Sequence, residues 1–134
     1  MRILFFIDGL KSGGKERRLI ELLKYLEIVG QDYHVVLIHR EIFFGSDLLS
    51  SGKLTFVSKK SKKSIKPFIE FYKLCKVYKP DIIHTWSSMV AFYSLPTVIL
   101  QRLCLINSQI SDAPDRINRL SFFFLILYLI HIIF

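Results

Sequence analysis

The first 38 residues contain the pattern that most restricts the fold. Residues 3–7 are an unbroken apolar run, which is typical of a strand buried on both faces. The glycine-rich stretch 8–14 follows, and then four leucines recur with the spacing of one helix face: Leu19, Leu22, Leu23 and Leu26. Gly30 is placed to end this helix, and a second apolar run occupies residues 35–38. Strand, glycine turn, helix and strand predict a βαβ unit whose first strand lies in the interior of a parallel sheet.

The remainder of the chain repeats this alternation. We expect further strands at residues 54–57, 81–86 and 103–106, and a helix with an apolar face between the first two of them. That face consists of Phe68, Phe71, Tyr72 and Cys75. Another helix is expected around residues 89–103, where Pro96 should kink it or end and restart it. In a chain of 134 residues, which is long enough for one core, the alternation predicts a doubly wound α/β fold with a mainly parallel sheet.

Two common phosphate-binding loops are excluded by spacing. Residues 9–15 match the pattern GxxxxGK, but Glu16 stands where a P-loop requires Ser or Thr to hold magnesium. The dinucleotide fingerprint GxGxxG is absent, and the second strand ends on His39 or Arg40 instead of the acid that would hold a ribose. We therefore expect neither a nucleoside triphosphatase nor a dinucleotide-dependent enzyme.

Gly13 and Gly14 are still compatible with a more general kind of anion binding. Glycines at the start of a helix let a ligand approach the free backbone amides, where the helix dipole favours an anion such as a diphosphate. The alternative is that both glycines only permit a tight turn between strand and helix. The two cysteines form no disulfide framework and no zinc-binding pattern, so we expect a cytoplasmic setting, no metal and no cofactor.

The net charge of +8 is confined to one segment. Residues 53–79 hold nine lysines and one acid, while the rest of the chain is balanced. Proteins that bind nucleic acids usually spread Arg and Lys over a face with stacking aromatics, so we expect no nucleic-acid partner. The lysines around one loop favour either plain solvation or attraction to an anionic membrane surface. The candidate membrane-surface residues are Lys59, Lys60, Lys62, Lys63 and Lys66.

The apolar C-terminal segment, residues 122–134, raises the mean hydropathy to +0.38. As a helix it would reach roughly 20 Å, short of the roughly 30 Å of a bilayer core. It is therefore expected to be a core or interface helix whose partner is missing, with interfacial membrane contact or an anchor as alternatives. An unpartnered apolar helix also predicts poor solubility.

Three sequence elements carry a resemblance. They are SGGKER at residues 12–17, KPDIIHTW at residues 79–86 and INSQISDAP at residues 106–114. In this order and at this separation they resemble the N-terminal domain of family 4 glycosyltransferases, from residue 1 to about residue 120. The resemblance implies the N-terminal, Rossmann-like half of a GT-B fold, followed at residues 121–134 by an apolar helix that is truncated before the donor domain.

The resemblance also implies roles for individual residues. Gly13, Gly14 and Lys15 match the loop that lies against the donor diphosphate and the acceptor. Trp86 replaces the second His of a frequent HxH pattern, so we expect Trp86 and the adjacent Ser87 to contact the acceptor, and His84 to be a hydrogen-bonded core residue. Asp112 either accepts hydrogen bonds from sugar hydroxyls or caps the next helix. No residue is assigned as catalytic.

The resulting expectation is half an enzyme. The chain would be the acceptor-side domain of a retaining glycosyltransferase that moves a sugar from a nucleotide-sugar donor to a polysaccharide or lipid-linked glycan, without a catalytic metal. It would be inactive alone, because the donor-holding domain is missing. The location would be the cytoplasm or the inner face of the plasma membrane. The alternative is a non-catalytic membrane-peripheral or interaction domain that uses the lysine-rich loop and the apolar tail.

Overall fold

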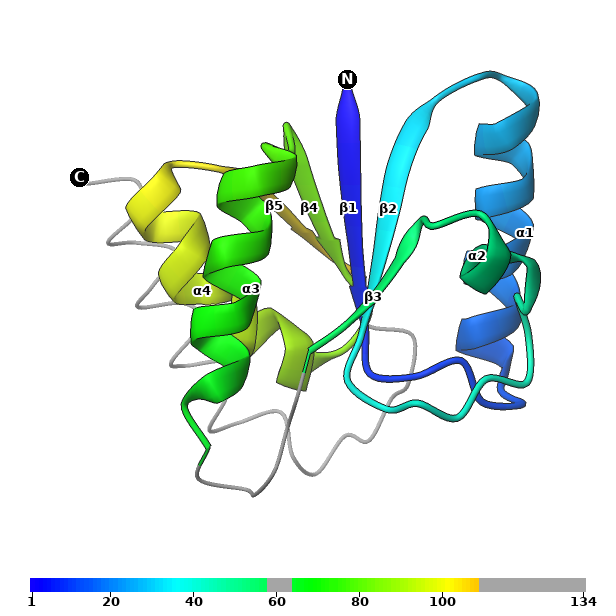
Figure 1. The fold of residues 1–134 in the computed structure, drawn as a ribbon, viewed down its shortest axis with the longest axis horizontal. Coiled ribbons are helices and arrows are strands. Elements are labelled where there is room, and N and C mark those ends of the chain that lie inside the picture. Colours follow the sequence, from blue (N-terminus) through cyan, green and yellow to red (C-terminus); the bar gives the residue numbers. More distant parts are fainter. Residues whose placement is uncertain (58–63, 109–134) are drawn as a thin grey trace.

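The computed structural model describes residues 1–57 and 64–108, which form one parallel sheet of five strands between two layers of helices (Figure 1). The strands are β1 (Arg2–Ile7), β2 (Asp32–Leu37), β3 (Leu54–Phe56), β4 (Ile82–Thr85) and β5 (Cys104–Asn107). Their order across the sheet is β3-β2-β1-β4-β5, with β1 in the centre. The predicted doubly wound, Rossmann-like fold is confirmed.

The helices are α1 (Gly14–Ile28), α2 (Asp47–Ser50), α3 (Lys66–Tyr78) and α4 (Ser88–Gln101). Helices α1 and α2 lie over one face of the sheet, and α3 and α4 lie side by side over the other (Figure 1). This arrangement follows from the connections, since the chain crosses to one face after β1 and to the other after β3 and β4.

Strand β1 is buried on both faces, which explains its continuous apolar run. Phe5 and Ile7 pack with α1, while Leu4 and Phe6 pack with α3 and α4, and all four side chains are at most 1% exposed. The Phe6 ring stacks on Phe71 of α3 with centroids 4.6 Å apart. Full burial of an apolar side chain of this size stabilises the folded state by about 1.5–3 kcal/mol. Strand β1 therefore stabilises the apolar core on both sides of the sheet.

Two details differ from the expectations. Of the two outcomes expected at Pro96, an end and restart of the helix does not occur, since α4 continues from Ser88 to Gln101. Pro96 lies on the exposed side of α4, where the backbone carbonyl that loses its amide partner can be hydrated, so the helix does not have to end there. The short helix α2 was not expected, because a single turn is too short to produce an apolar periodicity.

Some expectations concern residues outside the described ranges. These are the membrane-surface lysines Lys59, Lys60, Lys62 and Lys63, the candidate acceptor residue Asp112, the apolar segment 122–134 and the domain boundary at residue 120. They stay predictions.

Gly30 ends α1 as predicted, and it supplies a test of the fold. Its φ of +69° is in the left-handed region, and the amide of Gln31 then bonds back to the carbonyl of Leu26 at 2.9 Å. Since a Cβ at Gly30 would meet no atom within 4 Å, the cost of Gly30→Ala is conformational. We expect the free energy of unfolding in urea to fall by about 1–2 kcal/mol.

The matched control for this prediction is Gly14→Ala. A Cβ at Gly14 also meets nothing within 4 Å, but its φ is not in the left-handed region. The control should therefore leave the free energy of unfolding unchanged or raise it by up to about 1 kcal/mol. An equal loss in both variants would contradict the assigned role of Gly30.

Candidate functional site

The candidate site lies at the carboxyl ends of β1 and β4, where the strand order reverses. The chain leaves β1 toward α1 on one face of the sheet and leaves β4 toward α4 on the other (Figure 1). The two strands are direct neighbours, with Phe6 opposite Thr85, and the amide of Trp86 donates to the Phe6 carbonyl at 3.0 Å. In sheets of this type, ligands bind in the crevice that such divergent loops create.

The β1–α1 loop, residues 8–13, is held in place by the segment that follows β2. The amide of Phe43 donates to the Leu10 carbonyl at 2.7 Å, and the amide of His39 donates to the Asp8 carbonyl at 2.8 Å. The Leu10 side chain is fully buried, and Leu10 forms an isolated parallel bridge with Ile42. The loop is therefore positioned by backbone hydrogen bonds and apolar burial.

Gly13 and Gly14 lie at the open N-terminal end of α1. Gly13 is the N-cap residue and half-buried, Gly14 is exposed, and no side chain caps the helix with a hydrogen bond. A Cβ at Gly14 would meet nothing within 4 Å, so the packing of the protein does not require glycine there. A Cβ at Gly13 would collide only with the carboxylate of Glu16, which is the end of a flexible side chain. The backbone of this turn is accessible to a ligand.

Charged side chains surround this turn: Asp8 and Glu16 share Lys15, and Lys11 pairs with Glu41. The Lys15 Nζ lies 2.7 Å from Asp8 Oδ1 and 3.8 Å from Glu16 Oε1, so one cation lies between two carboxylates. All three side chains are partly buried, with the Glu16 side chain only 12% exposed. The charge of Lys15 is thus compensated within the protein. Carboxylates at this position accept hydrogen bonds from hydroxyl groups better than they tolerate a diphosphate.

Sequence reasoning identified Lys15 but missed its two partners. Asp8 directly follows a buried strand at the carboxyl edge of the sheet, which was the available signal for a binding residue. Glu16 was considered only as the residue that excludes a P-loop.

Trp86 and Ser87 lie on the adjacent loop, between β4 and α4. Trp86 is 6% exposed, packs in the apolar layer beneath α1 and lies 5.2 Å from the His84 ring. Within the described part of the chain, neither the Trp86 indole Nε1 nor the Ser87 Oγ has a hydrogen-bond partner, although both atoms are buried. An unpaired buried polar group costs about 1–3 kcal/mol, so a ligand that pairs with either atom would recover free energy. Stacking of the ring on a sugar stays a prediction.

His84 has the environment expected of a core histidine. Its Nε2 lies 2.7 Å from the Oγ of Ser108, and its ring lies 5.4 Å from that of Phe5. Burial lowers the pKa of His84, because the imidazolium form loses hydration there. The interaction with Ser108 connects β4 to the residue that follows β5. Holding these two strands together at the carboxyl edge is a sufficient role for His84.

The structure thus brings five of the predicted residues to adjoining loops: Gly13, Gly14, Lys15, Trp86 and Ser87. Lys66 lies elsewhere, at the start of α3 on the other face of the sheet. Among the described residues, no group of three His, Cys, Asp or Glu side chains is arranged to hold a metal ion.

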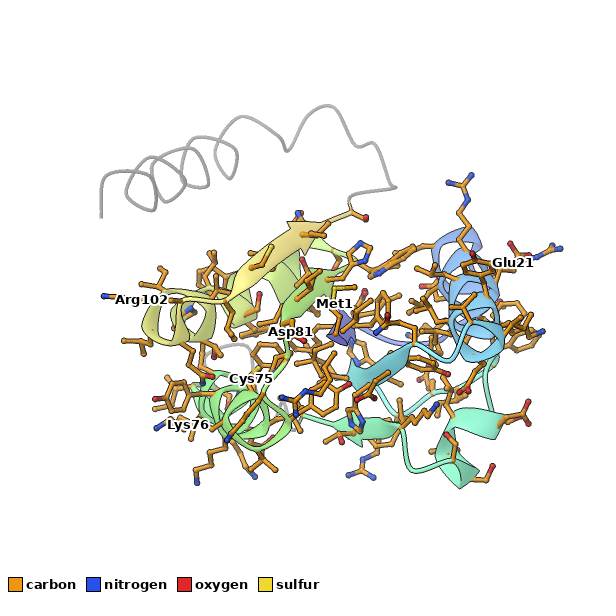
Figure 2. The ribbon with its side chains drawn as sticks, turned by 90° about the horizontal axis from the view of Figure 1, so that it is seen from above. Met1, Glu21, Cys75, Lys76, Asp81 and Arg102 are labelled. Carbon is orange, nitrogen blue, oxygen red and sulfur yellow. The ribbon has the colours of Figure 1, made fainter. Side chains whose placement is uncertain are left out.

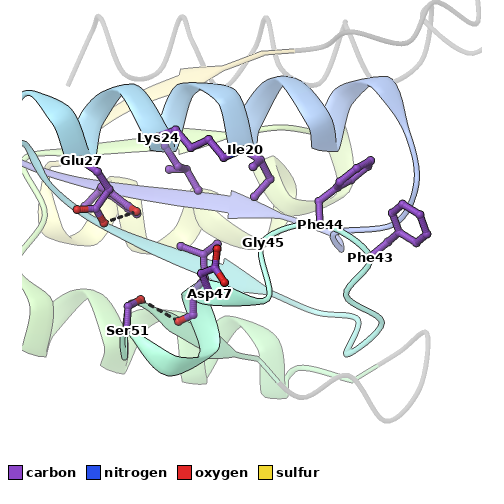
Figure 3. A pocket seen from close by; sticks show the side chains of 11 residues that line it. Ile20, Lys24, Glu27, Phe43, Phe44, Gly45, Asp47 and Ser51 are labelled. Atoms are coloured by element: carbon purple, nitrogen blue, oxygen red, sulfur yellow. Dashed lines mark hydrogen bonds between the residues drawn. The ribbon is translucent and has the colours of Figure 1, made fainter.

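A pocket of about 450 Å³ lies beside the loop, between α1 and residues 43–51 (Figure 3). Its apolar wall includes Ile20, Phe44 and Leu48, and Lys24 and Asp47 lie at its rim. None of the site residues predicted from the sequence lines it. The pocket adjoins the segment that anchors Leu10, so it neighbours the candidate site without forming part of it.

Comparison with known proteins shows the fold and no more. No protein-family model and no curated protein sequence matches this chain. Among solved structures, the apo form of the lipopolysaccharide outer core galactosyltransferase WaaB superposes with a TM-score of 0.66 at 16% identity, over 80% of this chain and 32% of that one. MurG of Acinetobacter baumannii superposes with a TM-score of 0.63 at 12% identity, over 90% of this chain and 38% of that one. UDP-GlcNAc 2-epimerase of Methanocaldococcus jannaschii superposes with a TM-score of 0.64 at 12% identity, over 95% of this chain and 36% of that one.

The chain therefore spans about a third of the length of these structures. It has the fold of the N-terminal, Rossmann-like half of GT-B proteins. This agrees with the fold that the sequence elements implied.

The environment of His84 predicts how stability depends on pH. The unfolded chain binds a proton on this residue near the ordinary pKa of 6.5, whereas the folded chain binds it only at a lower pH. The free energy of unfolding should therefore be constant well above pH 6.5 and fall as the pH drops below it, by up to about 1.4 kcal/mol per pH unit for each such histidine. His34, whose pKa is also lowered mainly by burial, adds to the slope.

Urea unfolding at several pH values between 8 and 5 checks this, with His84→Gln as the variant. The variant should show a shallower pH dependence, with His34 accounting for what remains. Hydrogen bonds from Lys53 and Tyr33 hold the pKa of Glu27 below its ordinary value of 4.5, so this carboxylate affects stability mainly below pH 5. An unchanged slope in His84→Gln, or a pKa above 6.5 in an NMR titration of His84, would contradict the interpretation.

Proposed function

We propose that the chain is the acceptor-binding domain of a retaining GT-B glycosyltransferase of the family 4 type. Its partner substrates would be a nucleotide-sugar donor and a polysaccharide or lipid-linked glycan acceptor. The observation that carries the proposal is the accessible backbone turn at Gly13–Gly14, at the carboxyl edge of the sheet and on the strand next to a loop with two buried polar atoms that have no partner among the described residues. The three sequence elements SGGKER, PDIIH and SDAP support the same function.

In this proposal the loop residues bind and orient an acceptor sugar. The carboxylates of Asp8 and Glu16 accept hydrogen bonds from sugar hydroxyls, and the backbone at Gly14 lies close to the ring because no Cβ intervenes. The Trp86 Nε1 donates to a sugar oxygen, and the Ser87 Oγ donates or accepts as needed. Asp112 remains a candidate for a further hydroxyl contact.

Sugar transfer needs more than this chain provides. The donor phosphates must be neutralised and the anomeric carbon positioned against the acceptor. The charge of Lys15 is already compensated by Asp8 and Glu16, so Lys15 is poorly placed to neutralise a diphosphate. We therefore assign donor binding to a second GT-B domain and expect no transfer activity from these residues alone.

The GT-B fold by itself does not choose the reaction, since one of the neighbours is named an epimerase and another a galactosyltransferase. Transfer is favoured by the three sequence elements. A non-catalytic domain is the alternative, and it requires that sugars fail to bind at this loop.

Ligand-observed NMR with methyl β-galactoside and methyl β-N-acetylglucosaminide tests the proposal. At least one glycoside should bind with a dissociation constant on the order of 1 mM, which corresponds to a binding free energy of about −4 kcal/mol. Gly14→Ala should weaken this binding about ten-fold, because the new Cβ occupies the space next to the backbone, while the stability is maintained. Glu16→Gln should weaken it by a similar factor through the loss of a charged acceptor.

The matched control for Glu16→Gln is Glu21→Gln, which removes an exposed carboxylate of the same helix away from the loop. It should leave glycoside binding unchanged. The proposal is wrong if neither glycoside binds, if both glutamate variants weaken binding equally, or if UDP alone binds this loop more tightly than the glycosides.

A further inference from the structure

The pocket between α1 and residues 43–51 has no role in the sugar-binding proposal. Its volume of about 450 Å³ lies within the range of pockets that hold small organic molecules, roughly 300–1,000 Å³. Ile20 and Leu23 of α1 line one side, and Phe44 and Leu48 line the other (Figure 3). No helix that the structure describes, α1 included, is long and apolar enough to cross a membrane.

The two walls of the pocket are held at a fixed separation. Gly45 has a φ of +78°, in the left-handed region, and a Cβ at this position would lie 2.6 Å from Ile20 Cδ1. Glycine therefore lets residues 43–51 approach α1 closely at this point. The same segment is also anchored by the amide of Phe43, which donates to the Leu10 carbonyl at 2.7 Å. The pocket is thus shaped by the fold itself, as small-molecule sites usually are.

Polar groups at one end of the pocket satisfy one another. The Tyr33 hydroxyl donates to Glu27 Oε1 at 2.8 Å, and the Lys53 Nζ donates to the same oxygen at 2.6 Å. The Lys53 Nζ also lies 4.6 Å from the centre of the Tyr33 ring. The hydrogen bonds from Lys53 and Tyr33 lower the pKa of Glu27, so this carboxylate is charged at neutral pH and balanced by Lys53. This end of the pocket therefore carries no net charge.

Two further charges at the rim are not balanced in this way. Lys24 comes from α1 and Asp47 from α2, so a cation and an anion belong to facing walls (Figure 3). Both residues are exposed. Within residues 1–57 and 64–108, neither side chain forms an ion pair or a hydrogen bond, and the two do not pair with each other. Each charge can therefore bind a group of the opposite sign on a ligand.

We propose that this pocket binds a free α-amino acid with a large apolar side chain. The apolar side chain lies between the two walls, the α-ammonium group lies at Asp47 and the α-carboxylate lies at Lys24. Burial of the side chain drives binding, and the two charged contacts orient the ligand. Charge complementarity selects this class, because a simple amine or a simple acid would leave one of the two rim charges unused.

The site is separate from the proposed sugar site. The pocket contains none of the residues assigned to the acceptor, and its lining belongs to α1, Tyr33 and residues 43–51. The amino-acid proposal therefore does not depend on the proposed function, and each can fail without the other.

Titration of the ¹⁵N-labelled chain with L-phenylalanine tests the proposal. L-Phenylalanine should bind with a dissociation constant on the order of 1 mM or lower and should shift the amides of residues 44–48. The indole N–H of Trp86 should not move. Glycine carries the same two charges without an apolar side chain, so it should bind at least about ten-fold more weakly.

Two analogues, each with one charge removed, test the assignment of the rim. Phenethylamine keeps the ring and the ammonium group, and 3-phenylpropionate keeps the ring and the carboxylate. Asp47→Asn should weaken L-phenylalanine and phenethylamine about five-fold without weakening 3-phenylpropionate. Lys24→Gln should weaken L-phenylalanine and 3-phenylpropionate about five-fold without weakening phenethylamine. Both side chains are exposed, so both variants should fold like the parent chain.

The matched controls remove one charge of each sign from α1 outside the pocket. They are Glu21→Gln and Arg18→Gln, which change two exposed residues that do not line the pocket. Figure 2 shows Glu21 on the outer side of α1, directed away from the sheet. Both controls should leave the affinity for all three aromatic ligands within about two-fold of the parent value.

Four results would overturn the proposal. The first is that L-phenylalanine at about 10 mM shifts no amide of residues 44–48. The second is that glycine binds as tightly as L-phenylalanine. The third is that Asp47→Asn and Lys24→Gln change the affinity for both analogues alike, which would indicate that the rim charges do not contact the ligand. The fourth is that a methyl glycoside displaces L-phenylalanine and shifts the same amides, which would assign the pocket to the sugar.

Discussion

The burial of β1 on both faces is the constraint from which the rest of the structure follows. A strand with four consecutive side chains at most 1% exposed must lie between two helical layers, so it takes the centre of the sheet. The chain then turns to one face after β1 and to the other after β4, and the two loops diverge at the carboxyl edge. The position of the Gly13–Gly14 turn and the Trp86–Ser87 loop at this edge is thus a consequence of where the apolar residues of β1 must go.

Charge is arranged differently at the carboxyl edge of the sheet and on the outer surface of α3. Where β1 leads into α1, the carboxylates of Asp8 and Glu16 share Lys15, and their remaining oxygen lone pairs suit hydroxyl groups. The α3 surface carries lysines with a single acid and suits anions.

The sequence predicted the elements that are set by local pattern. The apolar run of β1, the leucine spacing of α1 and its end at Gly30 all depend on burial periodicity and backbone conformation within a few residues. It did not predict that Lys15 is paired with Asp8 or that Trp86 lies beneath α1, because both depend on which faces come together in the fold. The apolar α4 was expected to be an ordinary helix of the fold, since hydropathy alone cannot show that Ile99 and Leu100 face outward.

The single tryptophan of the chain offers the most direct measurement of the central claim, that the crevice is a sugar-binding site. Its indole N–H gives one resonance in a ¹H–¹⁵N spectrum, and the Nε1 is buried without a partner in the described structure. The account predicts that a bound methyl glycoside shifts this resonance downfield together with the amide of Gly14, and that Gly14→Ala reduces both shifts. An indole resonance that does not move while the glycoside perturbs only residues 43–51 would place the sugar in the neighbouring pocket and contradict the account.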